Sequence, residues 1–168
     1  TPNTLLEESG CLFGGGYVDN STVDKTFVTI NGGNIRNSVF GGGEIAAIGR
    51  GDMKAKTGGT DYELKGIYRP GKTNVKMYSG HVHRNVFGGG RGYDNLGRHG
   101  SLHNDGYVFG QTEVSIHGGE IGTVSGVADG DGNVFGGGDV GFVYSAYVNP
   151  DGSFGKGVKG GVRYDGLY

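Results

Sequence analysis

The residues best spaced for metal chemistry lie in an acidic, glycine-rich segment near residue 130. Asp129, Asp131 and Asn133 place oxygen atoms at positions i, i+2 and i+4, with a glycine after each aspartate. Calcium loops use this spacing and end on a glutamate at their twelfth position. Here that position is Val140, and Asp139 is the nearest substitute. Two interpretations stay open, a calcium site with Asp139 or an ordinary acidic turn, and the missing glutamate favours the turn.

Two pairs of histidines could also bind a metal. His81 and His83 would share one face of a strand, and His99 and His103 lie in a later loop. Histidine pairs bind zinc when further ligands complete the site. No third ligand is fixed by the spacing, so we expect these side chains to be solvated polar groups.

Candidate catalytic groups are scattered along the chain. The segments between repeats carry acids and bases that could converge on a polysaccharide, namely Asp52, Asp61, Glu63, Lys65, Asp94 and Arg98. The single cysteine, Cys11, has no histidine near it in the sequence. Catalysis needs an activated group with a partner in reach. We therefore predict no enzymatic activity, with a polysaccharide-cleaving enzyme as an alternative.

Several tyrosines could contact a ligand. Tyrosine rings next to hydrogen-bonding groups suit protein or sugar contacts, and four have asparagine or arginine nearby: Tyr62, Tyr68, Tyr93 and Tyr107. A carbohydrate-binding module is thus a second alternative. The competing interpretation is that these rings cover the ends of the repeated units.

A repeated five-residue motif must position all of these residues. Val-Phe-Gly-Gly-Gly occurs at residues 39–43, 86–90 and 134–138, and Leu-Phe-Gly-Gly-Gly at residues 12–16. Before the last three copies runs the pattern Thr-x-Val-x-(Ile/Met)-x-(Gly/Ser)-Gly-x-(Ile/Val). Equivalent phenylalanines are 27, 47 and 48 residues apart. Such periods are typical of solenoids, propellers and arrays, and the longer ones imply insertions, at 44–72, 91–106 and 124–133.

The pattern before each motif alternates with a period of two, as expected for a strand with one buried face. Stacking the copies would place Val28 over Val75 over Val114, and Ile30 over Met77 over Ile116. The four motif phenylalanines would form a ladder: Phe13, Phe40, Phe87 and Phe135. The glycine pairs after the strand would turn the chain. The glycine triplets would form corners and allow backbones to approach where a Cβ would collide.

We therefore predict one all-β domain over residues 1–168, a right-handed parallel β-helix or β-solenoid of about three to four coils. The coils span about residues 12–143, and 144–168 form a C-terminal hairpin or edge strand, because Asn-Pro-Asp-Gly at 149–152 favours a turn. A β-propeller is the alternative fold. The chain begins with threonine, so we expect it to be a piece of a longer protein.

Composition excludes several partners. Glycine is 40 of 168 residues, which disfavours helices. The net charge of −2 gives no basic surface for nucleic acid. No apolar run approaches the roughly 18–20 residues of a transmembrane helix.

The repeated motifs resemble the glycine-rich parallel β-helix repeats of large bacterial surface proteins, adhesins especially, in the style of gut Bacteroidetes. The resemblance covers about residues 12–143. It implies an extracellular or cell-surface location and a non-enzymatic role in adhesion or filament structure. The expected partners are neighbouring repeats or other copies of the chain, with surface glycans or a host protein as further partners. Apart from the calcium alternative, no cofactor is expected.

Overall fold

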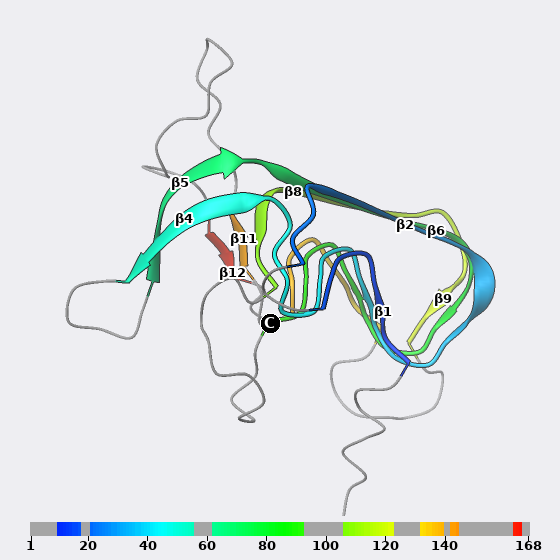
Figure 1. Ribbon diagram of the computed structural model, residues 1–168. Coiled ribbons are helices and arrows are strands. Elements are labelled where there is room, and N and C mark those ends of the chain that lie inside the picture. Colours follow the sequence, from blue (N-terminus) through cyan, green and yellow to red (C-terminus); the bar gives the residue numbers. More distant parts are fainter. Residues whose placement is uncertain are drawn as a thin grey trace, which may run out of the picture.

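The computed structural model describes residues 10–17, 21–55, 62–92, 106–122, 132–139, 142–144 and 163–165, and these residues form β-strands and connecting segments without a helix (Figure 1). The strands are β1 (Leu12–Phe13), β2 (Lys25–Ile35), β3 (Val39–Phe40), β4 (Arg50–Ala55), β5 (Tyr62–Arg69), β6 (Gly71–Val82), β7 (Val86–Phe87), β8 (Val108–Ile116), β9 (Glu120–Ile121), β10 (Val134–Phe135), β11 (Phe142–Tyr144) and β12 (Arg163–Asp165).

The four copies of the motif pair with one another in parallel. We call the segments around residues 12–16, 39–43, 86–90 and 134–138 the first to fourth layers. Their short strands form one sheet in the order β1-β3-β7-β10, and each phenylalanine pairs with its equivalent in the next layer. The rings stack face to face with centroids 4.8, 4.9 and 4.9 Å apart. The predicted phenylalanine ladder is confirmed.

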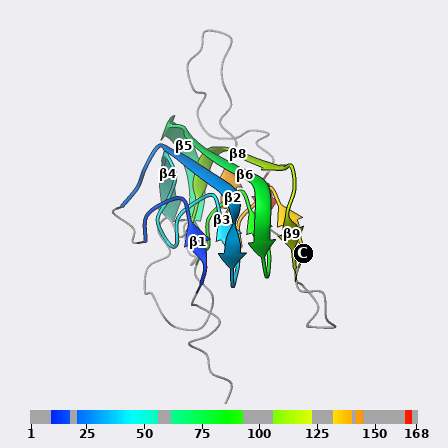
Figure 2. The ribbon, with the colours of Figure 1, turned by 90° about the vertical axis from the view of Figure 1, so that its right-hand side faces the viewer.

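The longer strands before the motifs form a second parallel row. β2 pairs with β6 and β6 with β8 in the predicted register, so Val28 lies beside Val75 and Val75 beside Val114. β9 continues this row by pairing with the end of β6. Figure 2 shows these strands next to one another. A third row joins the segments after the motifs, through bridges from Val23 to Ile48 and from Ile48 to Val108. β11 extends this third row by pairing with β8.

The strand faces follow the alternation of the sequence. Val28 and Ile30 are buried, whereas Thr29 between them is exposed. Val75 and Met77 are completely buried and belong to the same apolar cluster. At the fourth layer the cover is thinner, and Ile116 is 39% exposed.

Glycine turns the chain where the sequence predicts it. Gly33 has φ of 89° and Gly80 has φ of 105°, values that only glycine adopts without penalty. Gly119 repeats this conformation, with φ of 99°. The chain thus bends at the same place in each of these layers, two residues before the aliphatic residues Ile35, Val82 and Ile121.

Antiparallel pairing occurs at two places outside the layers. β4 and β5 form a hairpin, which extends away from the layered strands on the left of Figure 1. It occupies only residues 50–69 of the predicted insertion 44–72, because Glu44 and Ile48 pair within the layers. β12 pairs antiparallel with β11. The turn predicted at residues 149–152 lies outside the described residues, so the C-terminal hairpin over 144–168 stays a prediction. A β-propeller would need antiparallel four-stranded blades, so the parallel rows contradict that alternative.

Candidate assembly surface and contact residues

The glycine triplets are the points where successive layers lie closest. In the first three triplets the first glycine donates its N–H to the phenylalanine carbonyl of the next layer, at 2.8–2.9 Å, in the pairs Gly14–Phe40, Gly41–Phe87 and Gly88–Phe135. A Cβ added to Gly41 would lie 2.4 Å from the carbonyl oxygen of Gly88. The φ angle of Gly41 is not positive, so backbone conformation does not require glycine at this position. Close approach of two backbones is therefore the reason for glycine at this position.

A buried hydroxyl row accompanies the triplets. The threonine of each long strand donates its Oγ1 hydroxyl to the carbonyl oxygen of the first triplet glycine in its own layer, at 2.5, 2.5 and 2.6 Å, in the pairs Thr26–Gly41, Thr73–Gly88 and Thr112–Gly136. Thr26 and Thr73 are buried. A buried hydroxyl needs such a partner to offset its loss of water. The conserved spacing within the repeat contained this signal, but sequence reasoning gave the threonine no role.

A second polar row precedes the short strands. Cys11, Ser38, Asn85 and Asn133 each stand directly before a strand of the motif. The Asn85 N–H donates to Ser38 Oγ at 3.3 Å, and the Asn133 N–H donates to Asn85 Oδ1 at 2.9 Å. The side chains of Ser38 and Asn85 thus accept from the backbone of the next layer. Sequence reasoning missed this row, although a small polar residue recurs before every motif.

Cys11 is the first member of that row. Burial raises the pKa of its thiol, while the backbone N–H of Ser38 and the guanidinium of Arg91 oppose the rise. A thiol with a raised pKa is mostly protonated and weakly nucleophilic near neutral pH. Cys11 is therefore a half-buried, weakly reactive side chain directly before β1.

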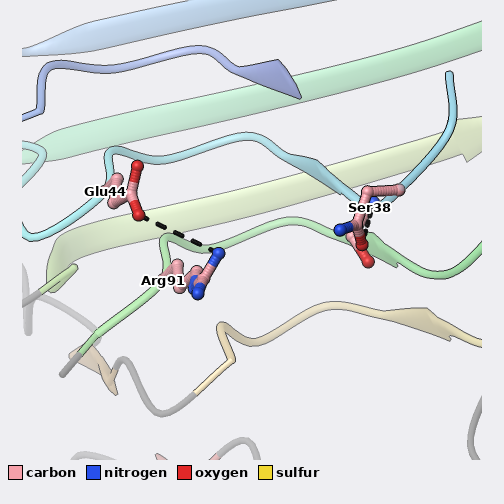
Figure 3. A network of polar contacts seen from close by, with 4 residues as sticks. Ser38, Glu44 and Arg91 are labelled. Carbon is pink, nitrogen blue, oxygen red and sulfur yellow. Dashed lines mark hydrogen bonds and ion pairs between the residues drawn. The ribbon is translucent and has the colours of Figure 1, made fainter. Parts of the chain in front are cut away.

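Alternating charges follow the triplets. Glu44 pairs in parallel with Arg91, and their Oε1 and Nη1 atoms lie 3.9 Å apart (Figure 3). Asp139 lies opposite Arg91 on the other side, because its N–H donates to Gly90 and its carbonyl accepts from Gly92. The row therefore reads negative, positive, negative from the second layer to the fourth.

The proposed calcium ligands divide between two parts of the chain. Asp129 and Asp131 lie outside the described residues. Asn133 and Asp139 flank the fourth motif, and both pair with the third layer through their backbones. Among the described residues, no group of three or more His, Cys, Asp or Glu side chains could hold a metal ion. Calcium binding stays a prediction for residues 129–139.

One of the four tyrosines proposed as contact residues is part of the interior. Tyr107 is 8% exposed, and its ring packs edge-on against Phe109 at 5.9 Å. The prediction that Tyr107 is a surface contact residue is therefore wrong, because Tyr107 begins a buried segment of the third row. Tyr62 and Tyr68 lie on β5 of the hairpin, and Tyr93 lies outside the described residues.

The two described histidines of the predicted pairs bind neighbouring layers. The rings of His81 and His83 stack with centroids 4.2 Å apart. His81 Nε2 lies 2.7 Å from the carbonyl oxygen of Gly122, and His83 Nε2 lies 2.6 Å from Asn34 Oδ1. Their side chains thus join β6 to both neighbouring layers. His99 and His103 lie outside the described residues.

The two outer strands of the short-strand sheet are β1 and β10. Val134 of β10 is 46% exposed, whereas its equivalents Val39 and Val86 are fully buried. An edge strand with an apolar side chain is a place where further strands can add. The outer side of β10 is thus the best-defined candidate for a contact surface in the described residues.

Comparison with protein-family models, with curated proteins and with solved structures finds no match to this chain. Within the described residues, no helix is long and apolar enough to span a membrane.

Proposed function

We propose that this chain is a short β-solenoid that serves as a structural module of a bacterial surface or secreted protein. Its proposed work is to hold inserted segments at fixed places, where they contact surface glycans or a host protein. The solenoid is supported by three rows of parallel pairing that link the same successive layers. The surface role is supported by the resemblance of the motifs to glycine-rich β-helix repeats of adhesins.

The observation that carries this proposal is the closed base of the first insertion. The chain leaves the second layer after Gly49 and returns at Gly71. A Cβ added to Gly49 would lie 2.5 Å from the Gly71 nitrogen, and one added to Gly71 would lie 2.6 Å from the Ile48 carbonyl. The hairpin therefore leaves and rejoins the layers at nearly one point, so its sequence can change without displacing them.

The second insertion has the same kind of base. Gly106 donates its N–H to the Ile45 carbonyl at 3.0 Å, and a Cβ added to Gly106 would lie 2.5 Å from the Arg91 carbonyl. The chain thus also leaves the layers after Gly92 and rejoins them at Gly106 at nearly the same point. Two such bases on successive layers favour a scaffold that presents variable segments.

Excision of the hairpin tests this function. Replacing residues 51–68 by Asn-Gly would join the paired residues Arg50 and Arg69 through a two-residue turn. We expect the layers to stay folded, as measured by far-ultraviolet circular dichroism, because the removed residues lie outside the parallel rows. Loss of the buried Ile67 side chain should lower the urea midpoint without abolishing the transition. Binding to a glycan array or to host matrix protein should fall if the hairpin is the contact element.

A core variant and an activity assay provide the controls. Val75→Asp introduces a charge at a fully buried position and should unfold the chain. Unfolding of the excision variant as well would contradict a scaffold independent of its hairpin. Release of reducing sugars from polysaccharide by the unaltered chain would replace the structural role with an enzymatic one.

A further inference from the structure

We propose that the outer side of β10 is a docking surface for the first layer of a second copy of this chain, so that copies join head to tail in register. This inference rests on the structural module proposed above and names a second copy of the chain as its binding partner. The contact would place Leu12 and Phe13 of one copy beside Val134 and Phe135 of another.

Gly136, the first glycine of the fourth triplet, is not required by any contact or backbone angle in the described part of the chain. A Cβ added to Gly14, Gly41 or Gly88 would lie 2.4–2.7 Å from the carbonyl oxygen of the equivalent glycine in the next layer. At Gly136 an added Cβ would meet nothing within 4 Å, and φ there is not positive. Gly136 therefore preserves the close-approach geometry on the side where a fifth layer would lie.

The hydrogen-bonding groups of the fourth layer have the polarity that a fifth layer needs. Between the second and third layers, N–H groups donate in the pairs Val39–Asn85, Gly41–Phe87 and Gly42–Gly89. The third glycine accepts in return, since Arg91 N–H donates to Gly43 O. By the same register, the equivalent N–H groups of the fourth layer, those of Val134, Gly136 and Gly137, point away from the third layer. The carbonyls of Cys11, Phe13 and Gly15 in a second copy occupy the matching acceptor positions.

The apolar groups at the two ends are also complementary. Val134 is 46% exposed and would be covered by Leu12 of the docked layer. Phe13 would continue the ring stack beyond Phe135 at the spacing of 4.8–4.9 Å that joins the existing rings. Stacked aromatic pairs of this kind add about 0.5–1.5 kcal/mol beyond their area burial.

The opposite end of the same stack offers a matching layer, since residues 12–16 hold a copy of the motif. β1 carries such a motif and is the opposite outer strand of the same sheet. Joining the two ends uses different surfaces on each copy, and such heterologous contacts build open chains. β12 pairs with β11 on the side away from β8, and the contact proposed here is between the short strands β10 and β1.

Gly136→Val tests the docking surface without disturbing the layers. The side chain has space in the isolated chain but would collide with a docked backbone. In sedimentation velocity at rising concentration, the unaltered chain should form a growing series of species. Gly136→Val should weaken that association by at least about tenfold, with unchanged circular dichroism. Val134→Lys, at the exposed apolar position beside it, should do the same.

Mixing and a surface control decide the geometry. Gly136→Val keeps its first layer, so in a head-to-tail chain it should cap the unaltered protein and shorten its assemblies in electron micrographs. A tail-to-tail dimer predicts no effect of mixing and would overturn the proposal. Phe27→Ser removes the most exposed aromatic ring among the described residues, which is 72% exposed on β2, and should leave assembly unchanged. A folded, unaltered chain that stays monomeric would refute docking alone, whereas loss of the layered fold would refute the module.

Discussion

Glycine has two different roles in this chain. Gly33 and Gly80 supply positive φ at the bends near the ends of β2 and β6. Gly41 and Gly88 instead allow the backbones of neighbouring layers to touch, since a Cβ would lie 2.4 Å from the facing carbonyl at Gly41. Thr73 depends on this approach, because its hydroxyl donates to the Gly88 carbonyl. Substitutions at the two kinds of glycine should therefore fail for different reasons.

Gly41→Ala should destabilise the fold by about 1–3 kcal/mol, because the added methyl group must displace a packed backbone. The free energy of unfolding in urea measures this loss. The matched control is Gly136→Ala, at the equivalent position of the fourth layer. It should be neutral or slightly stabilising in the monomer, because alanine reduces the freedom of the unfolded chain. Equal losses at both positions would mean that close approach is not what Gly41 provides.

At the scale of elements, charged side chains link neighbouring strands on the outer face. Lys72 Nζ of β6 lies 3.1 Å from Glu113 Oε2 of β8. Arg69, at the end of β5, binds Asp24 just before β2 at 2.8 Å. These pairs are solvent-exposed and contribute little to stability, but they favour the observed register between strands.

The pKa of Glu113 reports on this register. The hydrogen bond and the charge of Lys72 lower it, with smaller contributions from Asn74 and Lys76. A carboxyl whose pKa is lower in the folded state stabilises the fold above its ordinary pKa of about 4.3, and this contribution is lost as the pH falls through the lowered value.

Lys72→Gln should therefore raise the pKa of Glu113 toward its ordinary value, as measured by an NMR titration. Lys25→Gln is the control, because Lys25 pairs with Lys72 from the opposite side. That control should leave the Glu113 titration nearly unchanged. A titration insensitive to Lys72→Gln would place the two strands in another register.

At the scale of the whole molecule, the two inner of the four described layers are better covered than the fourth. Val39 and Val86 in the second and third layers are fully buried, whereas Val134 in the fourth is 46% exposed. Repeats that contact only their neighbours have stabilities set by each layer and its interfaces. Opening of such a stack should therefore begin at an outer layer.

Amide hydrogen exchange on the monomer should follow this gradient. The N–H of Gly41, which bonds Phe87 between the two inner layers, should exchange more slowly than the N–H of Gly88, which bonds Phe135 in the outer layer. Addition of a docked copy should slow exchange at Val134 and Gly136. Uniform exchange across the layers would indicate a single cooperative unit without weaker ends.

The sequence by itself determined the repeat, the alternation of the strands and the stacking of equivalent residues. Alternation with a period of two determines which face of a strand is buried. Because the same motif recurs, stacking its copies places equivalent residues beside one another. The phenylalanine ladder and the pairing of Val28, Val75 and Val114 followed from those two facts. The turn glycines followed as well, because positive φ is a local property.

Only the tertiary structure decided what depends on distances between layers. It gave the threonine hydroxyls and the polar row from Ser38 to Asn133 their backbone partners, and it buried Tyr107. It also reduced the first insertion to residues 50–69 and folded it as a hairpin. Ile45 takes φ of 68°, which no local preference of a β-branched residue predicts. These features arise from packing against residues far along the chain. The repeat shows that the threonine and the polar residue recur, but it does not show which groups they bind.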